Sequence, residues 1–208
     1  MGSIELDTRE RLLNAAIAVV DEAGVEGIRV RDIAAAAEVR EPSVYHYFGS
    51  REGLVEAVEA ARFKRDAITV TGMFSQAVAS CVSMEEYLDL CARVMIAVEQ
   101  PGRIAVRSVR AGVFGSAQSR PGLAKLVSDA QLELDHDLAN GLEQAKERGW
   151  VRPDLDCLSF AAWLNGMVNG RVIIEMNPEA YNAETWRDMT LKTTLLGMGY
   201  VDGKPTWL

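Results

Sequence analysis

Apolar residues recur every three or four positions along most of the chain, which is the spacing of amphipathic helices. The first such run carries Leu13 and Ile17 on one face and stops at Gly24. Asp7 followed by Glu10 predicts a capping box at its start. No alternation of apolar and polar residues predicts a convincing β-strand. The pattern therefore predicts an all-α protein.

The helices expected before residue 50 are short. Apolar residues at 30–37 have helical spacing, and a third helix begins near Glu41 with Pro42 in its first turn, where a missing N–H costs nothing. Gly49 ends this helix, and Ser50 is a suitable N-cap for the next one. Two short helices behind a longer one predict a helix-turn-helix.

Longer helices are expected in the rest of the chain, separated by segments that contain proline or glycine. They are expected at about 51–78, 84–99, 102–115, 121–148, 155–176 and 183–197. We predict about nine helices in two domains. The first is a helix-turn-helix domain at 1–50 that continues into a connecting helix at 51–78, and 79–208 forms the larger domain.

Four aromatic rings follow one another in the segment REPSVYHYFGSRE (40–52). Val44 and Phe48 lie four residues apart, so both face the core of a helix-turn-helix. The rings that remain at the surface each have a polar tip: Tyr45, His46 and Tyr47. Hydroxyl and imidazole groups can donate hydrogen bonds to phosphate oxygens of DNA. In this motif the second short helix lies in the major groove, where Arg31 and Arg40 can offer two donors each to guanine.

The segment GIRVRDIAAAAEVREPSVYHYFGSREGLVEAV (27–58) resembles the DNA-binding domain of the TetR family of transcriptional repressors. The matching elements are Ile33-Ala34, Val39, the run Ser43 to Phe48, the turn Ser50-Arg51-Glu52, and Leu54. The resemblance implies that DNA bases are contacted by Arg31, Arg40, Glu41, Pro42 and His46. It implies that phosphates are held by Ser43, Tyr45, Tyr47 and Arg51, the last at a helix N-terminus that favours an anion.

Glu38 departs from the family pattern, because it occupies a turn position where glycine is frequent. A positive φ there would strain the turn. The charge is also unusual for a DNA-binding domain, which is ordinarily basic. The chain has a net charge of −8, and residues 1–66 carry nine Lys and Arg against thirteen Asp and Glu, a net of −4. We expect the acids to face away from DNA, and specific binding to weaken steeply with salt.

In the TetR family the second domain dimerises and binds a small effector. The segment 155–176 is apolar nearly all round, so it must be covered on more than one side. We predict a homodimer interface of two helices from each chain, with an ordinary monomer core as the alternative. Its residues are Trp163, Gly166, Met167, Gly170, Leu191 and Leu195.

The predicted effector pocket uses apolar and sulfur-containing side chains together with one arginine. Its candidate residues are Tyr87, Cys91, Met95, Arg110, Phe114, Trp163 and Met167. Each apolar one is more often plain core than a ligand contact. Arg103, Arg107 and Arg110 form a stripe at helical spacing. They could meet an acidic ligand group, but a solvated face with surface ion pairs is the favoured interpretation.

Other functions find little support in the sequence. His46 and His136 are the only histidines, too few for most catalytic metal sites, and no catalytic constellation is recognisable. We therefore predict no enzyme activity, no cofactor and no metal. Three distant cysteines indicate free thiols in a reducing compartment. Asn165 and Arg171 interrupt the apolar stretch at 157–176, which favours a buried helix over a membrane span and a cytoplasmic protein.

The combined prediction is a ligand-responsive transcriptional regulator. In its favoured form, a dimeric repressor binds a palindromic operator of double-stranded DNA and is released by a small-molecule effector. The alternative is a helical small-molecule-binding protein or enzyme whose N-terminal module does not bind DNA.

Overall fold

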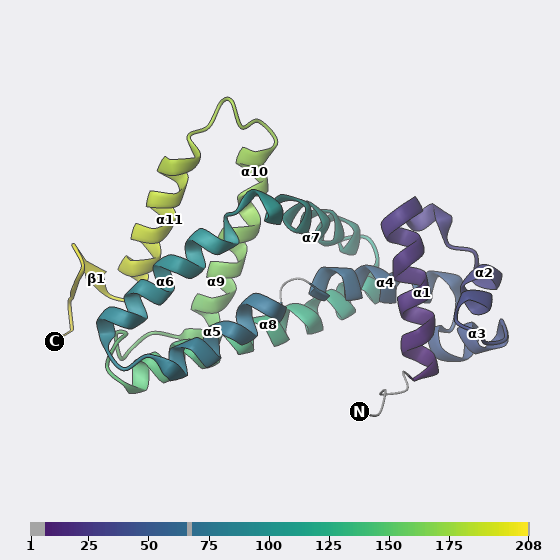
Figure 1. Ribbon diagram of the computed structural model, residues 1–208, viewed down its shortest axis with the longest axis horizontal. Helices are drawn as coiled ribbons and strands as arrows, with labels where there is room; N and C mark the ends of the chain where they lie inside the picture. The colour runs from purple at the N-terminus through teal and green to yellow at the C-terminus, as the bar shows by residue number, and fades with distance from the viewer. Residues whose placement is uncertain (1–6, 66–67, 208) are drawn as a thin grey trace. The chain divides into compact units, whose positions relative to one another are not determined.

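The computed structural model describes residues 7–65 and 68–207, and the chain is all-α as predicted (Figure 1). Its helices are α1 (Thr8–Ala23), α2 (Val30–Ala36), α3 (Pro42–Phe48), α4 (Arg51–Arg65), α5 (Ile68–Ser80), α6 (Met84–Val98), α7 (Ile104–Ala117), α8 (Pro121–Glu147), α9 (Cys157–Gly170), α10 (Val172–Glu175) and α11 (Ala183–Gly197). Two 3-10 turns are η1 (Val25–Gly27) and η2 (Pro101–Arg103). A hairpin joins β1 (Tyr200–Val201) to β2 (Lys204–Pro205).

The described residues contain eleven α-helices, against about nine predicted. The predicted helix at 51–78 corresponds to α4 and α5, and residues 66–67 lie outside the described residues. The predicted helix at 155–176 is interrupted at Arg171, directly after Gly170, a residue that weakens helices. The predicted capping box is wrong, since Asp7 precedes α1 but makes no side-chain capping hydrogen bond.

The small hairpin was not predicted from the sequence. Tyr200 pairs with Pro205 and Val201 with Lys204. Asp202 and Gly203 between them both have positive φ, 50° and 73°. An Asp-Gly pair is a strong signal for such a turn, but the strands are too short to show an alternating pattern.

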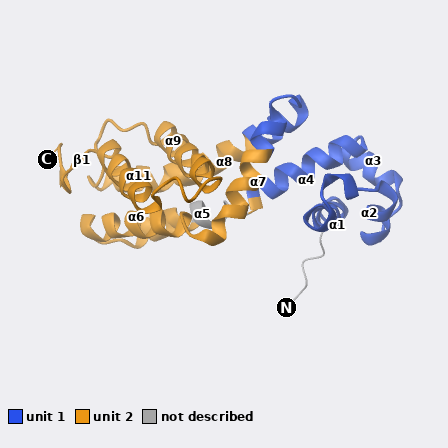
Figure 2. Cartoon of the chain, turned by 90° about the horizontal axis from the view of Figure 1, so that it is seen from above, with its two compact units in different colours: residues 1–64, 113–128 blue, residues 65–112, 129–208 orange. Residues whose placement is uncertain are grey.

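Two compact units make up the chain (Figure 2). Unit 1 comprises residues 1–64 and 113–128, and unit 2 comprises 65–112 and 129–208. The C-terminal end of α7 and the N-terminal end of α8 therefore belong to unit 1, whereas the remainder of both helices belongs to unit 2. The predicted division into functional domains at 50 and 78 stays a prediction.

Unit 1 has its core between α1, α2, α3 and α4. Leu12, Ile33, Val44 and Leu54 are fully buried there, and Phe48 packs partly buried against them. Ser50 caps α4 as predicted, since its Oγ accepts a hydrogen bond from the Gly53 N–H at 2.9 Å. A Cβ on Gly53 would lie 2.0 Å from the carbonyl oxygen of Phe48, so the tight passage from α3 to α4 requires glycine.

Unit 2 has a separate core centred on Tyr87, whose hydroxyl donates a hydrogen bond to Met198 Sδ at 3.2 Å. The three cysteines are free thiols, as predicted, and Cys91 and Cys157 are buried. Burial raises the pKa of both Cys91 and Cys157 to about 12. Each is therefore a neutral thiol at physiological pH and packs as an apolar group.

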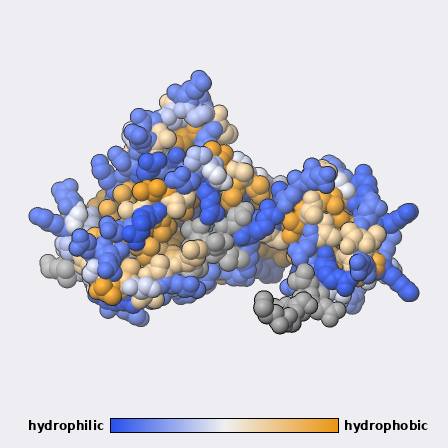
Figure 3. All heavy atoms as spheres, viewed as in Figure 1, coloured by the Kyte–Doolittle hydropathy of each residue, from blue (hydrophilic) through white to orange (hydrophobic). Residues whose placement is uncertain are grey.

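The apolar segment Cys157–Glu175 is only partly covered by its own chain. It is the one candidate in the described residues that is long and apolar enough to cross a membrane, but only 28% of its tested window is buried. The prediction of a buried helix is therefore wrong within a single chain. Several large apolar residues of this segment and of α11 are exposed: Leu158, Trp163, Ile173, Met189 and Leu196. Apolar patches also interrupt the hydrophilic surface on the face seen in Figure 3.

Candidate functional site

The surface formed by α3 carries the side chains expected to meet DNA. Val44 is fully buried under this helix, whereas Tyr45 and Tyr47 are 47% and 38% exposed and His46 is exposed. The rings of His46 and Tyr47 meet edge to face with centroids 4.9 Å apart. The predicted division between inward and outward residues is therefore confirmed. The rings of Tyr45, His46 and Tyr47, each with a polar tip, lie at the surface and outside the core of unit 1.

The turn between α2 and α3 is held by a contact that the sequence did not reveal. Glu38 has a φ of 55°, so the turn does carry a positive φ at a residue with a Cβ, the condition under which strain was expected. The Arg11 guanidinium donates from Nε to the Ala37 carbonyl at 3.1 Å and from Nη2 to the Glu38 carbonyl at 3.3 Å. These bonds tie α1 to the turn and fix the position of α3 relative to α2.

Most of the other residues predicted to contact DNA are exposed: Arg31, Arg40, Glu41 and Pro42. Ser43 is half-buried. Arg51 differs from them because its guanidinium already has partners in the protein. Its Nε donates to the Ile28 carbonyl at 3.2 Å and its Nη2 to the Val25 carbonyl at 3.4 Å. A phosphate contact through this side chain would compete with these bonds and stays a prediction.

Three glutamates of α4 surround one arginine in unit 1. Arg120 Nη2 lies 2.6 Å from Glu52 Oε1, and its Nε lies 3.9 Å from Glu56 Oε1. Its Nη1 donates to Glu59, which is 8% exposed. Arg120 precedes α8, so this cluster joins the α7–α8 connection to α4. Part of the negative charge of unit 1 is thus paired within the unit.

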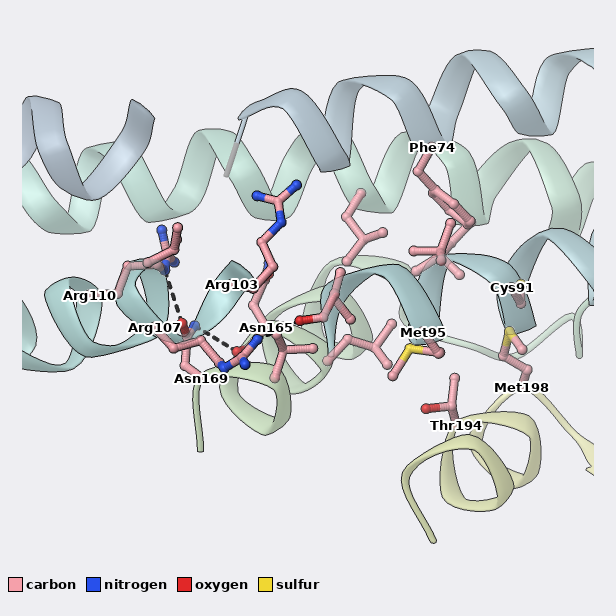
Figure 4. A pocket seen from close by; sticks show the side chains of 17 residues that line it. Phe74, Cys91, Met95, Arg103, Arg107, Arg110, Asn165, Asn169, Thr194 and Met198 are labelled. Atoms are coloured by element: carbon pink, nitrogen blue, oxygen red, sulfur yellow. Dashed lines mark hydrogen bonds between the residues drawn. The ribbon is translucent and has the colours of Figure 1, made fainter. Parts of the chain in front are cut away.

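Unit 2 contains a cavity of about 130 Å³ (Figure 4). Its walls come from α5, α6, α7, α8, α9 and α11, together with Arg103 of η2 and Met198 directly after α11. The polar part of its lining consists of Arg103, Arg107, Arg110, Asn165, Asn169 and Thr194. The apolar part consists of Phe74, Cys91, Val94, Met95, Val98, Val106, Leu138, Leu142, Leu164, Val168 and Met198. A mostly apolar cavity with a few convergent polar groups is typical of a small-molecule site.

The predicted pocket residues divide between this cavity and other places. Cys91, Met95 and Arg110 line it. The other four do not line it, and their contact with an effector stays a prediction. Tyr87 is fully buried in the core, Trp163 is 40% exposed and stacks on Phe160, and Met167 is half-buried beside the cavity lining. Phe114 lies in unit 1, where its ring meets that of Phe63 at 4.9 Å.

The arginine stripe of α7 is buried rather than solvated, so the favoured interpretation is wrong for Arg107 and Arg110. Arg107 is 2% exposed, and its Nε donates to Glu175 Oε2 at 3.0 Å. Its Nη1 and Nη2 donate to the Val98 carbonyl and to Glu175 Oε1. The partner carboxylate comes from α10, 68 residues away in sequence. Helical spacing on α7 alone could not reveal it.

Arg107 is one end of a buried network of charges. Glu175 also lies 3.3 Å from Arg171 Nε, and Arg171 Nη1 lies 3.1 Å from Glu99 Oε2. Arg187 of α11 reaches the same Glu99 oxygen at 3.1 Å. Buried charges are costly unless they are paired, and each carboxylate here faces two guanidinium groups. The network joins the ends of α6, α7, α10 and α11 beside the cavity.

Comparisons with known proteins agree with this arrangement. Residues 12–58 match the profile of the family described as bacterial regulatory proteins, tetR family. The chain is 19% identical over 149 residues to the HTH-type transcriptional regulator UidR of Escherichia coli K12, covering 72% of this chain and 71% of the relative.

Two solved structures share the fold over nearly the whole chain. GusR of Salmonella enterica is 19% identical, with a TM-score of 0.64 over 94% of this chain and 97% of its own. FadR of Thermus thermophilus, a TetR-family repressor solved with lauroyl-CoA, is 18% identical, with a TM-score of 0.68 over 95% and 98%.

The helix-turn-helix with its exposed α3, followed by a helical domain with a cavity, defines a transcriptional regulator of the helix-turn-helix class. Within that class, the DNA-binding domain at residues 12–58 belongs to the TetR family, and the chain shares the fold of TetR-family structures. The family resemblance of the segment 27–58 is therefore confirmed.

Proposed function

We propose that the protein is a homodimeric repressor that binds a palindromic operator and leaves it when a small molecule enters the cavity of unit 2. It acts in the cytoplasm, where its DNA target lies. The observation that carries this proposal is the free outer surface of α3 above the buried Val44. A helix in this position of a helix-turn-helix enters the major groove, and its polar side chains read bases and hold phosphates.

A second copy of the chain is the proposed cover for the exposed apolar surface of α9, α10 and α11. Trp163, Ile173, Met189 and Leu196 are each at least 40% exposed. A Cβ added at Gly166 or Gly170 would meet no other atom within 4 Å, so both glycines leave open space on α9. An isologous contact would fill it with the same helices of a partner.

The proposed interface differs in detail from the one expected on α11. Leu195 packs partly buried against the core of unit 2, and Leu191 is half-buried. Met189 and Leu196 are exposed instead. Gly197 explains this packing, because a Cβ there would lie 2.5 Å from the Phe160 ring of α9. The two helices meet closely within one chain, and their outer faces are left for the partner.

The proposed effector acts through α7. This helix contributes Val106, Arg107 and Arg110 to the cavity, and its C-terminal end belongs to unit 1. The connection after it carries Arg120, which pairs with the glutamates of α4. Helix α4 in turn directly follows α3. An effector that binds one arrangement of α7 more tightly lowers operator affinity by its difference in affinity between the two arrangements.

The operator affinity and the oligomeric state test this proposal. A gel shift against genomic fragments that include the DNA flanking the protein's own gene should show one specific complex. Sedimentation at micromolar concentration should give a dimer, and Met189→Asp with Leu196→Asp should give a monomer with weak operator binding. A monomeric wild-type protein, or the absence of any bound fragment, would reject the proposal.

A further inference from the structure

The three arginines that line the cavity of unit 2 have partners within the chain. Arg107 Nε donates to Glu175 Oε2 at 3.0 Å, and Arg110 Nε donates to Asn169 Oδ1 at 3.0 Å. Arg103 and Arg110 have further interactions as well. The positive charge of the lining is therefore engaged by the protein itself, and it does not require a charged ligand.

The two asparagines of the lining are also hydrogen-bonded. Asn165 Nδ2 donates to Asp135 Oδ1 at 2.7 Å, and Asn169 Nδ2 donates to the Asn165 carbonyl at 2.7 Å. A ligand group at this side of the cavity would have to displace bonds that the chain already makes. Displacement leaves buried polar groups without a partner, which is costly. A polar group of a ligand is better placed elsewhere in the cavity.

Thr194 of α11 offers such a place. It is 4% exposed, and within the described chain its Oγ1 is buried without a hydrogen-bond partner. A threonine in a helix often donates to the main-chain carbonyl one turn earlier, but this hydroxyl makes no such bond. Buried hydroxyl groups nearly always have a partner, so a polar atom of a ligand would complete this one.

The surroundings of Thr194 are apolar and contain sulfur. In Figure 4, Thr194 lies beside Met95 and Met198, whereas Arg110 and Asn169 lie at the other end of the group. A water molecule in a cavity needs about two to four polar partners, and these neighbours of Thr194 are thioethers. Thioether sulfur makes favourable contacts with aromatic rings. A ring with one polar atom therefore suits this end of the cavity better than water does.

The size of the cavity limits the ligand to about one ring. Its volume is about 130 Å³. An engineered apolar cavity of about 150 Å³ in another protein holds one benzene molecule. Phe74, Val94 and Leu142 extend the apolar wall. A charged ring compound would lose its hydration here, and the guanidinium groups of the lining already have partners, so a neutral compound is favoured.

We propose that the cavity binds a neutral single-ring aromatic molecule whose hydroxyl or carbonyl oxygen hydrogen-bonds to Thr194 Oγ1. This inference rests on the proposed effector role of the cavity and narrows that role to one chemical class. The ring fills the apolar space beside the methionines. The Thr194 hydroxyl can donate or accept a hydrogen bond, so it selects an oxygenated ring over a hydrocarbon of the same shape.

Pairs of probes with matched shapes test the oxygen preference in the wild-type protein. Calorimetric titrations would compare phenol with toluene, acetophenone with α-methylstyrene, and benzaldehyde with benzoate. At least one of the first two oxygenated compounds should bind at least as tightly as its hydrocarbon, although it loses more hydration, because Thr194 replaces the bond to water. Benzoate should bind more weakly than benzaldehyde.

Three results of these titrations would overturn the proposal. The first is that both hydrocarbons bind more tightly than their oxygenated partners. The second is that benzoate binds as tightly as benzaldehyde or more tightly. The third is that no compound of the panel binds.

Variants at Thr194 assign the preference to the hydroxyl. Thr194→Val keeps the shape of the side chain, and it should lower the affinity for the oxygenated compound relative to its hydrocarbon by about fivefold or more, because the ligand oxygen loses its partner. Thr194→Ser retains a hydroxyl and should keep the preference. Thr190→Val should keep it too, since Thr190 is buried on the same helix and does not line the cavity. An unchanged preference in Thr194→Val would overturn the assignment.

The operator gel shift separates this inference from the proposed function. Binding of phenol or acetophenone that depends on Thr194 and leaves the DNA complex intact would support the ligand class and reject release by that ligand. DNA release by a charged compound that occupies the cavity, with no binding of any neutral probe, would overturn the ligand class and leave the regulator intact.

Discussion

Two pairs of arginines in this chain differ in almost every physical respect. Arg31 of α2 and Arg40 before α3 are exposed in unit 1, while Arg107 and Arg110 of unit 2 are 2% and 4% exposed. An exposed arginine keeps its hydration until DNA replaces it, so it contributes to binding and little to folding. A buried arginine has lost its hydration already, so its partners become part of the stability of the fold. The same residue type is thus exposed and available for the proposed DNA contacts in one unit, and buried in the structure around a cavity in the other.

The largest effect expected from this difference concerns Arg107. Arg107→Met should lower the free energy of unfolding by about 3 kcal/mol, because Glu175 loses the partner that makes two hydrogen bonds with it. Urea denaturation followed by circular dichroism measures the change. Arg93→Met, on the exposed side of α6, should change it by less than about 0.5 kcal/mol. Equal stabilities for the two variants would mean that the buried network is not formed.

Replacement of Arg40 is expected to change the affinity for DNA and to leave the stability unchanged. Arg40→Ala should weaken operator binding by about 1–3 kcal/mol, or roughly 5- to 150-fold, because a guanidinium that meets a base edge is lost. Its unfolding transition should match that of the wild type, since the side chain is exposed. Fluorescence anisotropy with labelled operator DNA gives the affinity. A variant that unfolds earlier but binds DNA normally would reverse the comparison.

Relief of backbone strain at the turn between α2 and α3 is expected to have a smaller effect on the free energy of unfolding. Glu38→Gly should raise the free energy of unfolding by about 1 kcal/mol, because a φ of 55° is unfavourable for a residue with a Cβ. The hydrogen bonds from Arg11 go to main-chain carbonyls and are retained. Ala36→Gly in α2 is the control and should be destabilising by a similar amount. Thermal unfolding should therefore move the two variants in opposite directions.

The smallest effect is expected at Thr194. Thr194→Val should raise the free energy of unfolding of the ligand-free protein by up to about 1 kcal/mol, since it removes a buried hydroxyl that has no partner. Thr190→Val, from the buried position one turn earlier, should give no such gain. Parallel denaturation curves decide this. A loss of stability in Thr194→Val would show that the hydroxyl already has a partner in the free protein.

The sequence predicted unit 1 in more detail than unit 2 for a physical reason. In the helix-turn-helix, Val44 and Phe48 must face the core, so the directions of Tyr45, His46 and Tyr47 follow from helical geometry. The apolar residues of unit 2 have no such constraint. Three predicted pocket residues of unit 2, Tyr87, Met95 and Trp163, lie on helices with apolar residues at helical spacing, yet Tyr87 lies in the core, Met95 at the cavity and Trp163 at the surface. These positions are set by packing against helices that are distant in the sequence.

Ion pairs between residues far apart in the sequence were the other feature that could not be predicted. Arg107 meets Glu175 and Arg120 meets Glu59 across 68 and 61 residues. Many acids on the surface of the predicted helices were equally suitable partners, so spacing could not select among them. Burial of an arginine is decided by such a partner, which is why the stripe on α7 was predicted to be solvated. The extent of α8 did not depend on such partners: the helix was predicted at 121–148 and lies at Pro121–Glu147, because a proline marks its start in the sequence.

The most direct test of the account is an anisotropy titration of the wild-type protein and of Tyr45→Ala with His46→Ala against DNA from the region upstream of its gene, at several salt concentrations. We predict saturation at two chains per site for the wild type, an affinity that falls steeply with salt, and loss of specific binding in a double variant that remains folded. Equal affinity of the two proteins for the same fragment would contradict the assignment of α3 as the DNA-reading helix.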